Sequence, residues 1–174
     1  KYRAALQDGN PAELWELRGA GLWRQARGPK NASLEKCDLG LGAGVVKGAY
    51  AELPRYFADA DRVMDLETRI VWCMVTLQGF SEVDAKKGPF GGPNRKSDME
   101  AYVAFVTSES RGVKMNVPSR HPKEEEAFRL GDQAFQRVFV REDGLGPRFV
   151  HQSCAGCHVG DGRGRPLFAE RSEA

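Results

Sequence analysis

The residues with the most specific chemistry lie in one short segment, SCAGCH, at residues 153–158. Cys154 and Cys157 are separated by two residues, and His158 follows directly. In c-type cytochromes, two thiols at this spacing each form a thioether with one vinyl group of haem, while the adjacent imidazole binds the iron. The segment therefore predicts one covalently attached haem c, with His158 as the proximal ligand.

Other uses of a closely spaced cysteine pair remain open from the residues alone. A thioredoxin-like redox pair belongs in a strand-helix-strand setting, which the surrounding sequence does not predict. A zinc site needs a second pair of ligands at a suitable spacing, and the sequence lacks one. A structural disulfide between Cys154 and Cys157 is the third alternative. We favour haem attachment over all three.

The other two cysteines, Cys37 and Cys73, have no histidine or further cysteine beside them. A second haem is therefore not expected. Attachment of haem c takes place in an exported, oxidising compartment, where disulfides form and persist. We therefore predict a disulfide between Cys37 and Cys73, with two buried free thiols as the alternative.

The iron needs a second axial ligand, and the residues after the motif offer none. Residues 159–174 contain no methionine, histidine or cysteine, although a monohaem cytochrome c normally supplies this ligand from downstream. We therefore expect the distal ligand upstream, from Met115 or His121. Met64 and Met74 are expected in the core instead, because both lie at apolar positions of a predicted helix. The sequence assigns no catalytic residue.

The composition is that of a globular protein rather than a disordered or membrane-spanning one. The 174 residues are 41% hydrophobic and 29% charged, with a formal net charge of +2. This charge is too small to indicate a nucleic-acid partner. The longer apolar runs, such as residues 70–75, fall far short of the roughly 20 residues needed to cross a bilayer. We expect no nucleic acid, no membrane span, and other redox proteins as partners.

Apolar spacing and end signals predict a helical protein. Asn10 is the expected N-cap of the first helix, and Ser97 with Glu100 forms a capping box for a later one. The predicted helices cover residues 9–24, 61–77 and about 97–112, with a fourth beginning after Pro122. Residues 28–48 and 84–96 are predicted as loops, and no pair of strands with clear alternation is found. The fold class predicted is all-α.

Two prolines divide the chain. Pro118 and Pro122 exclude a continuous helix across residues 113–122 and favour extended backbone there. We predict this segment to be a linker between a domain at residues 1–112 and a second domain at residues 123–174.

Residues 10–126 resemble a known family. The likeness is carried by the stretches NPAELWELRGAGLWR, LEKCDLGLGAG, TRIVWCM and YVAFVTSESRGVKMNVPSRHPKE. These stretches are similar to the SoxA family, the c-type cytochrome subunits of the SoxAX complex of bacterial thiosulfate oxidation. Cys37 and Cys73 match the paired cysteines of this family.

The resemblance implies two tandem cytochrome c-like domains in a periplasmic protein, the first without haem and the second apparently truncated. It also implies an activity of the L-cysteine S-thiosulfotransferase type, in which thiosulfate is joined oxidatively to a carrier cysteine and electrons pass to haem. The expected partners are a SoxX-like cytochrome subunit and a SoxYZ-like carrier.

Two features depart from the family pattern. In the family a cysteine downstream of the haem motif is the second iron ligand, and residues 159–174 contain no counterpart. Residues 143–166 are more similar to the first haem loop of dihaem thiol-oxidoreductase-like cytochromes. The alternative function is therefore a monohaem electron-transfer subunit of a larger assembly without thiosulfate chemistry. A weaker third possibility is sensing of a small ligand at an open iron position.

Overall fold

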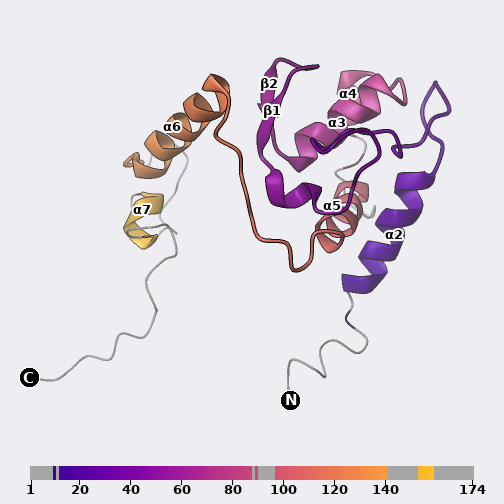
Figure 1. Ribbon diagram of the computed structural model, residues 1–174, viewed down its shortest axis with the longest axis horizontal. Helices are drawn as coiled ribbons and strands as arrows, with labels where there is room; N and C mark the ends of the chain where they lie inside the picture. Colours follow the sequence, from indigo (N-terminus) through magenta and orange to yellow (C-terminus); the bar gives the residue numbers. More distant parts are fainter. Residues whose placement is uncertain (1–9, 11, 88, 90–96, 141–152, 159–174) are drawn as a thin grey trace, which may run out of the picture. The chain divides into compact units, whose positions relative to one another are not determined.

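The computed structural model describes residues 10, 12–87, 89, 97–140 and 153–158 (Figure 1). The chain divides into two compact units, residues 1–124 and 125–174, and each is described by itself. The elements are α2 (Ala12–Arg24), η1 (Ala49–Glu52), β1 (Arg55–Phe57), β2 (Arg62–Met64), α3 (Leu66–Thr76), α4 (Glu82–Lys87), α5 (Asp98–Ser108), α6 (Pro122–Gln136) and α7 (Cys154–Cys157).

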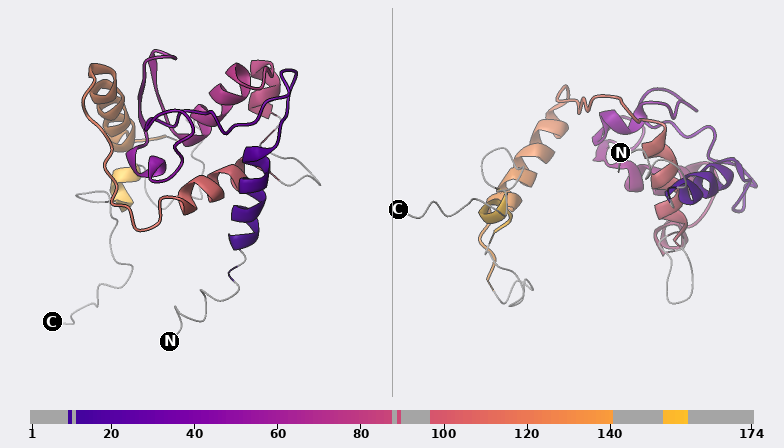
Figure 2. Two further views of the ribbon diagram at one scale, coloured as in Figure 1. Left: turned by 45° about the vertical axis from the view of Figure 1, so that its right-hand side comes forward. Right: turned by 90° about the horizontal axis from the view of Figure 1, so that it is seen from below.

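The first helix begins where its capping residue predicts. The Asn10 side-chain oxygen accepts a hydrogen bond from the Ala12 amide at 3.0 Å, which satisfies a donor that the helix leaves unpaired. Helix α2 then packs against α5, as both views of Figure 2 show. Gly19 and Trp23 are the buried residues of α2.

Helix α5 also follows its sequence signals. The Ser97 hydroxyl accepts a hydrogen bond from the Glu100 amide at 3.1 Å, as a capping box requires. The helix ends at Ser108 with Glu109 as its C-cap, so the predicted end near residue 112 is wrong by one turn. Gly112 lies beyond the helix, where its φ of 76° is a left-handed backbone that favours glycine.

The prediction of one helix over residues 61–77 is wrong in its first part. Residues 62–64 form strand β2, which pairs antiparallel with β1, and α3 begins only at Leu66. The Asp65 carboxylate accepts a hydrogen bond from the Thr68 amide at 2.8 Å and caps α3. The all-α prediction therefore needs one correction, a small two-stranded ribbon, because a favourable N-cap at Asp65 stops the helix short of the preceding residues.

The prediction of a loop from residue 84 is also wrong at its start. Residues Glu82–Lys87 form α4, where the Ser81 hydroxyl accepts a hydrogen bond from the Asp84 amide at 3.1 Å. Ala85 is fully buried on the inner side of this short helix. Burial of Ala85 gives the helix a tertiary support that local sequence does not reveal.

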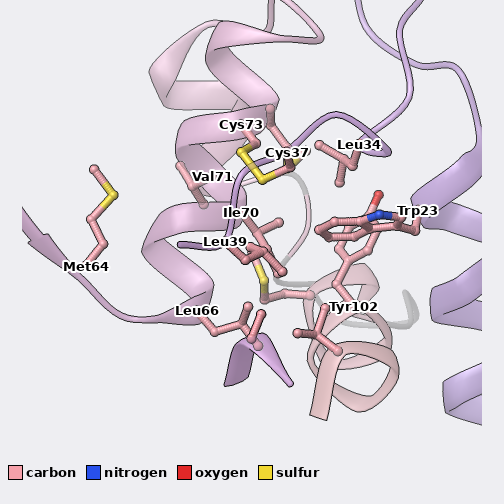
Figure 3. Packing of buried hydrophobic residues seen from close by; sticks show 14 of the residues in the cluster. Trp23, Leu34, Cys37, Leu39, Met64, Leu66, Ile70, Val71, Cys73 and Tyr102 are labelled. Atoms are coloured by element: carbon pink, nitrogen blue, oxygen red, sulfur yellow. A yellow bond between two sulfur atoms is a disulfide. The ribbon is translucent and has the colours of Figure 1, made fainter. Parts of the chain in front are cut away.

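The core of the first unit lies among α2, α3, α5 and the loop after α2 (Figure 3). Trp23 lies edge-on to Tyr102, with ring centroids 6.2 Å apart at 71°. This is a favourable geometry for two aromatic rings. Met64 and Met74 are 1% and 3% exposed, which confirms their predicted place in the core.

Arg69 is a buried cation that helps to organise this unit. It is only 3% exposed, and its guanidinium lies over the Phe57 ring at 4.0 Å. Its Nε donates to the Asp38 carbonyl at 2.7 Å, and a terminal nitrogen donates to the Asp59 carboxylate at 2.8 Å. The Trp72 indole donates to the same carboxylate at 3.2 Å. Asp59 therefore neutralises a charge that would be costly to bury alone.

The ion pair between Arg69 and Asp59 predicts a pH-dependent contribution to the stability of the fold. Burial alone would raise the pKa of Asp59, but the hydrogen bonds and charge of Arg69, with the Trp72 bond, hold it below its ordinary value of 3.8. Because folding lowers its pKa, the Asp59 carboxylate stabilises the folded state at pH values above the pKa that it has in the unfolded chain. This stabilisation is lost as the pH falls through the pKa of the folded state. We expect Asp59→Asn to reduce the free energy of unfolding by about 1 kcal/mol at neutral pH, a modest figure because the carboxylate is half exposed.

Urea unfolding of the wild type and Asp59→Asn at several pH values checks this expectation. The difference between them should shrink below about pH 4, where the carboxylate becomes protonated. The same change at exposed Asp132 should have little effect at any pH. A difference for Asp59→Asn that stays constant down to strongly acidic pH would contradict the role given to the charge.

The second unit contains the remainder of α6 and the single turn α7. Across the parts of the chain that the structure describes, no helix is long and apolar enough to cross a membrane. The architecture is thus mostly helical with one small ribbon, consistent with a cytochrome c fold. The division into tandem cytochrome c-like domains at residues 113–122 stays a prediction.

Candidate haem-attachment site

The cysteine motif lies on a single helical turn. Ser153 caps the turn, because its hydroxyl accepts a hydrogen bond from the Gly156 amide at 3.1 Å. The His158 amide donates to the Cys154 carbonyl at 3.0 Å and closes the turn. The backbone positions of Cys154 and Cys157 are therefore one turn apart, with His158 immediately beyond.

The side chains that the structure describes around this turn suit a prosthetic group. Cys154 is exposed and its thiol is free, and His158 is also exposed. The Phe135 ring on α6 lies against the His158 ring, with centroids 6.0 Å apart at 57°. Aromatic rings at this distance attract one another, so the contact favours this orientation of the imidazole.

The donor set fits haem. An exposed thiol, a neighbouring imidazole and a helical turn between them are the groups that covalent haem attachment uses. A porphyrin also needs apolar side chains for its faces. The described part of the second unit has such side chains at its surface, among them Phe128, Leu130 and Val138.

The two candidate distal ligands both lie in the first unit. Met115 is 54% exposed. The His121 ring stacks on Tyr56 at a centroid distance of 3.6 Å, and its Nδ1 accepts a hydrogen bond from the Lys123 amide at 3.2 Å. His121 can therefore bind iron through Nδ1 only if this bond is broken. The choice between Met115 and His121 stays a prediction.

The predicted disulfide between Cys37 and Cys73 is confirmed (Figure 3). It joins the loop after α2 to α3, and both residues are buried, at 0% and 3% exposure. The first unit is therefore cross-linked at its core. The loop that carries Cys37 contains no Cys-x-x-Cys-His motif.

The roles of two residues are not visible from the sequence pattern. Phe135 is an apolar residue of the helix after Pro122, and its contact with His158 depends on tertiary folding. Glu124 is an acid at the start of that helix, where negative charge is favourable. In the structure it is buried and accepts three backbone hydrogen bonds. Catalytic residues remain unassigned.

Comparison with known protein families shows to which of them the chain belongs. The SoxA/TsdA cytochrome c domain family matches residues 18–115. The chain belongs to this family. The matched region includes Cys37 and Cys73 and ends before Cys154.

Curated relatives of the chain are named as SoxA proteins. The chain is 46% identical over 163 residues to the L-cysteine S-thiosulfotransferase subunit SoxA of Hydrogenophilus thermoluteolus, covering 94% of this chain and 56% of that protein. It is 28% identical over 160 residues to a subunit of the same name from Hydrogenobacter thermophilus, covering 92% and 55%. The predicted resemblance to SoxA is thereby confirmed, and the chain spans about half the length of these relatives.

A solved structure supports the fold. The chain is similar to a chain in the crystal structure of SoxXA from P. pantotrophus, with a TM-score of 0.64 and 21% sequence identity. The likeness covers 92% of this chain and 53% of that chain. At this identity the match supports the fold and nothing finer.

Proposed function

We propose that the chain is part of a periplasmic SoxA-type cytochrome of thiosulfate oxidation that carries one haem c. Cys154 and Cys157 attach the haem, and His158 is its proximal ligand. The observation that carries this proposal is the complete Cys-x-x-Cys-His motif on one helical turn, with the Phe135 ring against His158. Family membership supports it, because cytochrome c domains hold haem c covalently.

The reaction we propose is the oxidative joining of thiosulfate to a cysteine of a SoxYZ-like carrier. A sulfur–sulfur bond forms between the carrier thiolate and the terminal sulfur of thiosulfate, and the thiol proton is released. Two electrons leave in this step. When bound at Cys154, Cys157 and His158, haem would supply a one-electron acceptor, and a SoxX-like cytochrome subunit would take the second electron. The names of the curated relatives support this activity, which is of the L-cysteine S-thiosulfotransferase type.

The chain's own residues would hold and orient the group. Cys154 and Cys157 would fix it to the backbone, His158 would direct an imidazole nitrogen to the iron, and the contact with Phe135 would favour one orientation of that imidazole. Met115 or His121 would complete the coordination. Residues 1–112 then form a haem-less cytochrome c-like domain, joined through residues 113–122 to a haem domain at residues 123–174.

A monohaem electron-transfer subunit is the second candidate. The feature that favours it is the sequence of residues 143–166, which is more similar to the first haem loop of dihaem thiol-oxidoreductase-like cytochromes than to SoxA. In this alternative the chain exchanges electrons with other redox proteins, and the haem-less first unit is a docking module. No sulfur chemistry takes place at the iron.

Thiosulfate and a SoxYZ-like carrier, added to the oxidised holoprotein with its SoxX-like subunit, distinguish the two candidates. The thiosulfate proposal predicts a carrier whose mass increases by one thiosulfate group, together with spectroscopic reduction of haem. A carrier whose cysteine is replaced by serine should give neither signal. Intact haem with no adduct and no reduction would contradict the thiosulfate proposal and favour electron transfer. Protein without covalent haem would contradict both.

A further inference from the structure

The segment that leads from α5 to α6 is extended, yet the first unit holds it at several points (Figure 1). The Asn116 amide donates to the Ala51 carbonyl in η1 at 2.7 Å. Pro118 is buried although its neighbours are exposed. We refer to residues 116–124 as the strap. Its path is therefore fixed by contacts with the first unit rather than by a regular element of its own.

Glu124 is the strongest of these anchor points. It is only 8% exposed. One carboxylate oxygen accepts a hydrogen bond from the Tyr56 amide in β1 at 2.6 Å. The other accepts from the Arg120 and His121 amides at 2.8 and 3.0 Å. A carboxylate that receives three amide donors ties the end of the strap to a strand 68 residues away in sequence.

Side chains around Tyr56 reinforce this anchor. The His121 ring lies parallel to the Tyr56 ring, at 3.6 Å and 2°. The Tyr56 hydroxyl donates to the Asp61 carboxylate at 2.7 Å, and the Lys123 ammonium pairs with the same carboxylate at 2.6 Å. Lys123 also donates to the Asp61 carbonyl at 2.8 Å. Each side chain that contacts Tyr56 here is therefore also bound to another part of the anchor.

We propose that Glu124 is a clasp, which seats the first turn of α6 on the β1–β2 ribbon and so makes the strap part of the first unit. The sequence pattern predicts a linker between two domains in residues 113–122 instead. With the clasp closed, those residues are part of the first unit. With the clasp open, residues 113–121 become a tether that reaches up to about 30 Å when extended. Glu124 thus controls the mobility of the strap, whether or not the second unit carries haem.

Hydrogen exchange of the whole protein, measured by mass spectrometry on Glu124→Ala and Glu125→Ala, tests this proposal. Glu125 is the next residue of the same helix and is exposed, so its replacement is the matched control. Peptides from residues 114–124 and 54–58 should exchange at least tenfold faster in Glu124→Ala and at the wild-type rate in Glu125→Ala. Peptides from α3 and α5 should be unchanged in both.

A further variant distinguishes loss of the Glu124 hydrogen bonds from a general loss of structure. Glu124→Gln keeps the shape of the side chain but has one acceptor oxygen in place of two. We expect strap exchange in Glu124→Gln to lie between the wild-type and Glu124→Ala rates. The proposal is overturned if the wild-type strap exchanges at the rate of an unfolded chain, or if Glu124→Ala leaves its rate unchanged. It is also overturned if α3 and α5 lose protection together with the strap, because the clasp is then not local.

Discussion

Replacement of both Cys37 and Cys73 by alanine is expected to lower the free energy of unfolding of the first unit by about 4 kcal/mol. The bond connects residues 36 apart, and a cross-link of this span restricts the unfolded chain by about that amount in the loop-entropy account. Alanine is the suitable replacement because both positions are buried, and serine would bury an unpaired hydroxyl. The thermal midpoint should fall by roughly 10–15 °C.

Urea unfolding followed by far-UV circular dichroism measures this loss. A reductant strong enough to open the bond should lower the stability of the wild type by a similar amount. The same reductant should leave the double variant unchanged, which separates the effect of the disulfide from any other action of the reductant. A loss below about 1 kcal/mol would show that the cross-link contributes little to this fold.

Gly19→Ala is expected to destabilise the protein by about 3 kcal/mol, the upper part of the usual cost of overpacking a core. A β-carbon at residue 19 would lie 1.9 Å from the Ala101 carbonyl oxygen and 2.7 Å from the Phe105 β-carbon. Both belong to α5, and the carbonyl is part of its backbone, so no side-chain rotation relieves the contact. The two helices must move apart, which also loosens the packing of Trp23.

Gly21→Ala is the matched control for this prediction. Gly21 lies on the same helix, is exposed, and would place its β-carbon more than 4 Å from any described atom outside the local chain. Replacement of an exposed helical glycine by alanine raises the free energy of unfolding by about 0.5–1 kcal/mol, because the unfolded chain loses conformational freedom. The two variants should therefore shift the urea midpoint in opposite directions. Equal shifts would contradict close packing of α2 on α5.

Local signals explain which elements the sequence predicts well. Asn10 and Ser97 begin helices because a short polar side chain satisfies amides in the same turn, and the interaction involves only neighbouring residues. Met74 could be placed in the core from helical apolar spacing, whereas Met64 is buried on strand β2 rather than on the predicted helix. The disulfide followed from the number of cysteines and the inferred compartment, because no other partner was available for either thiol.

Elements that depend on distant residues were not predictable in the same way. Strands of three residues are too short to show alternation, so the β1–β2 ribbon emerges only when residues 55–57 and 62–64 meet. Helix α4 depends on burial of Ala85. Glu124 looks like an ordinary acid at a helix start, because its partner Tyr56 is far away in sequence.

In the candidate site, too, the features set by neighbouring residues are predictable and those set by distant residues are not. Cys154, Cys157 and His158 are contiguous, so their spacing alone indicates the chemistry. The contact of Phe135 with His158 requires α6 and α7 to be folded. The distal ligand is a tertiary choice as well, and spacing cannot decide between Met115 and His121.

The intact mass of the native protein, denatured but not reduced, tests the central claim most directly. The account predicts a mass equal to the polypeptide plus one haem and minus two hydrogens, the latter for the single disulfide. The Cys154→Ser, Cys157→Ser double variant should lose the haem and keep the disulfide. A wild-type mass without haem, or the same haem mass in the variant, would contradict covalent attachment at this motif.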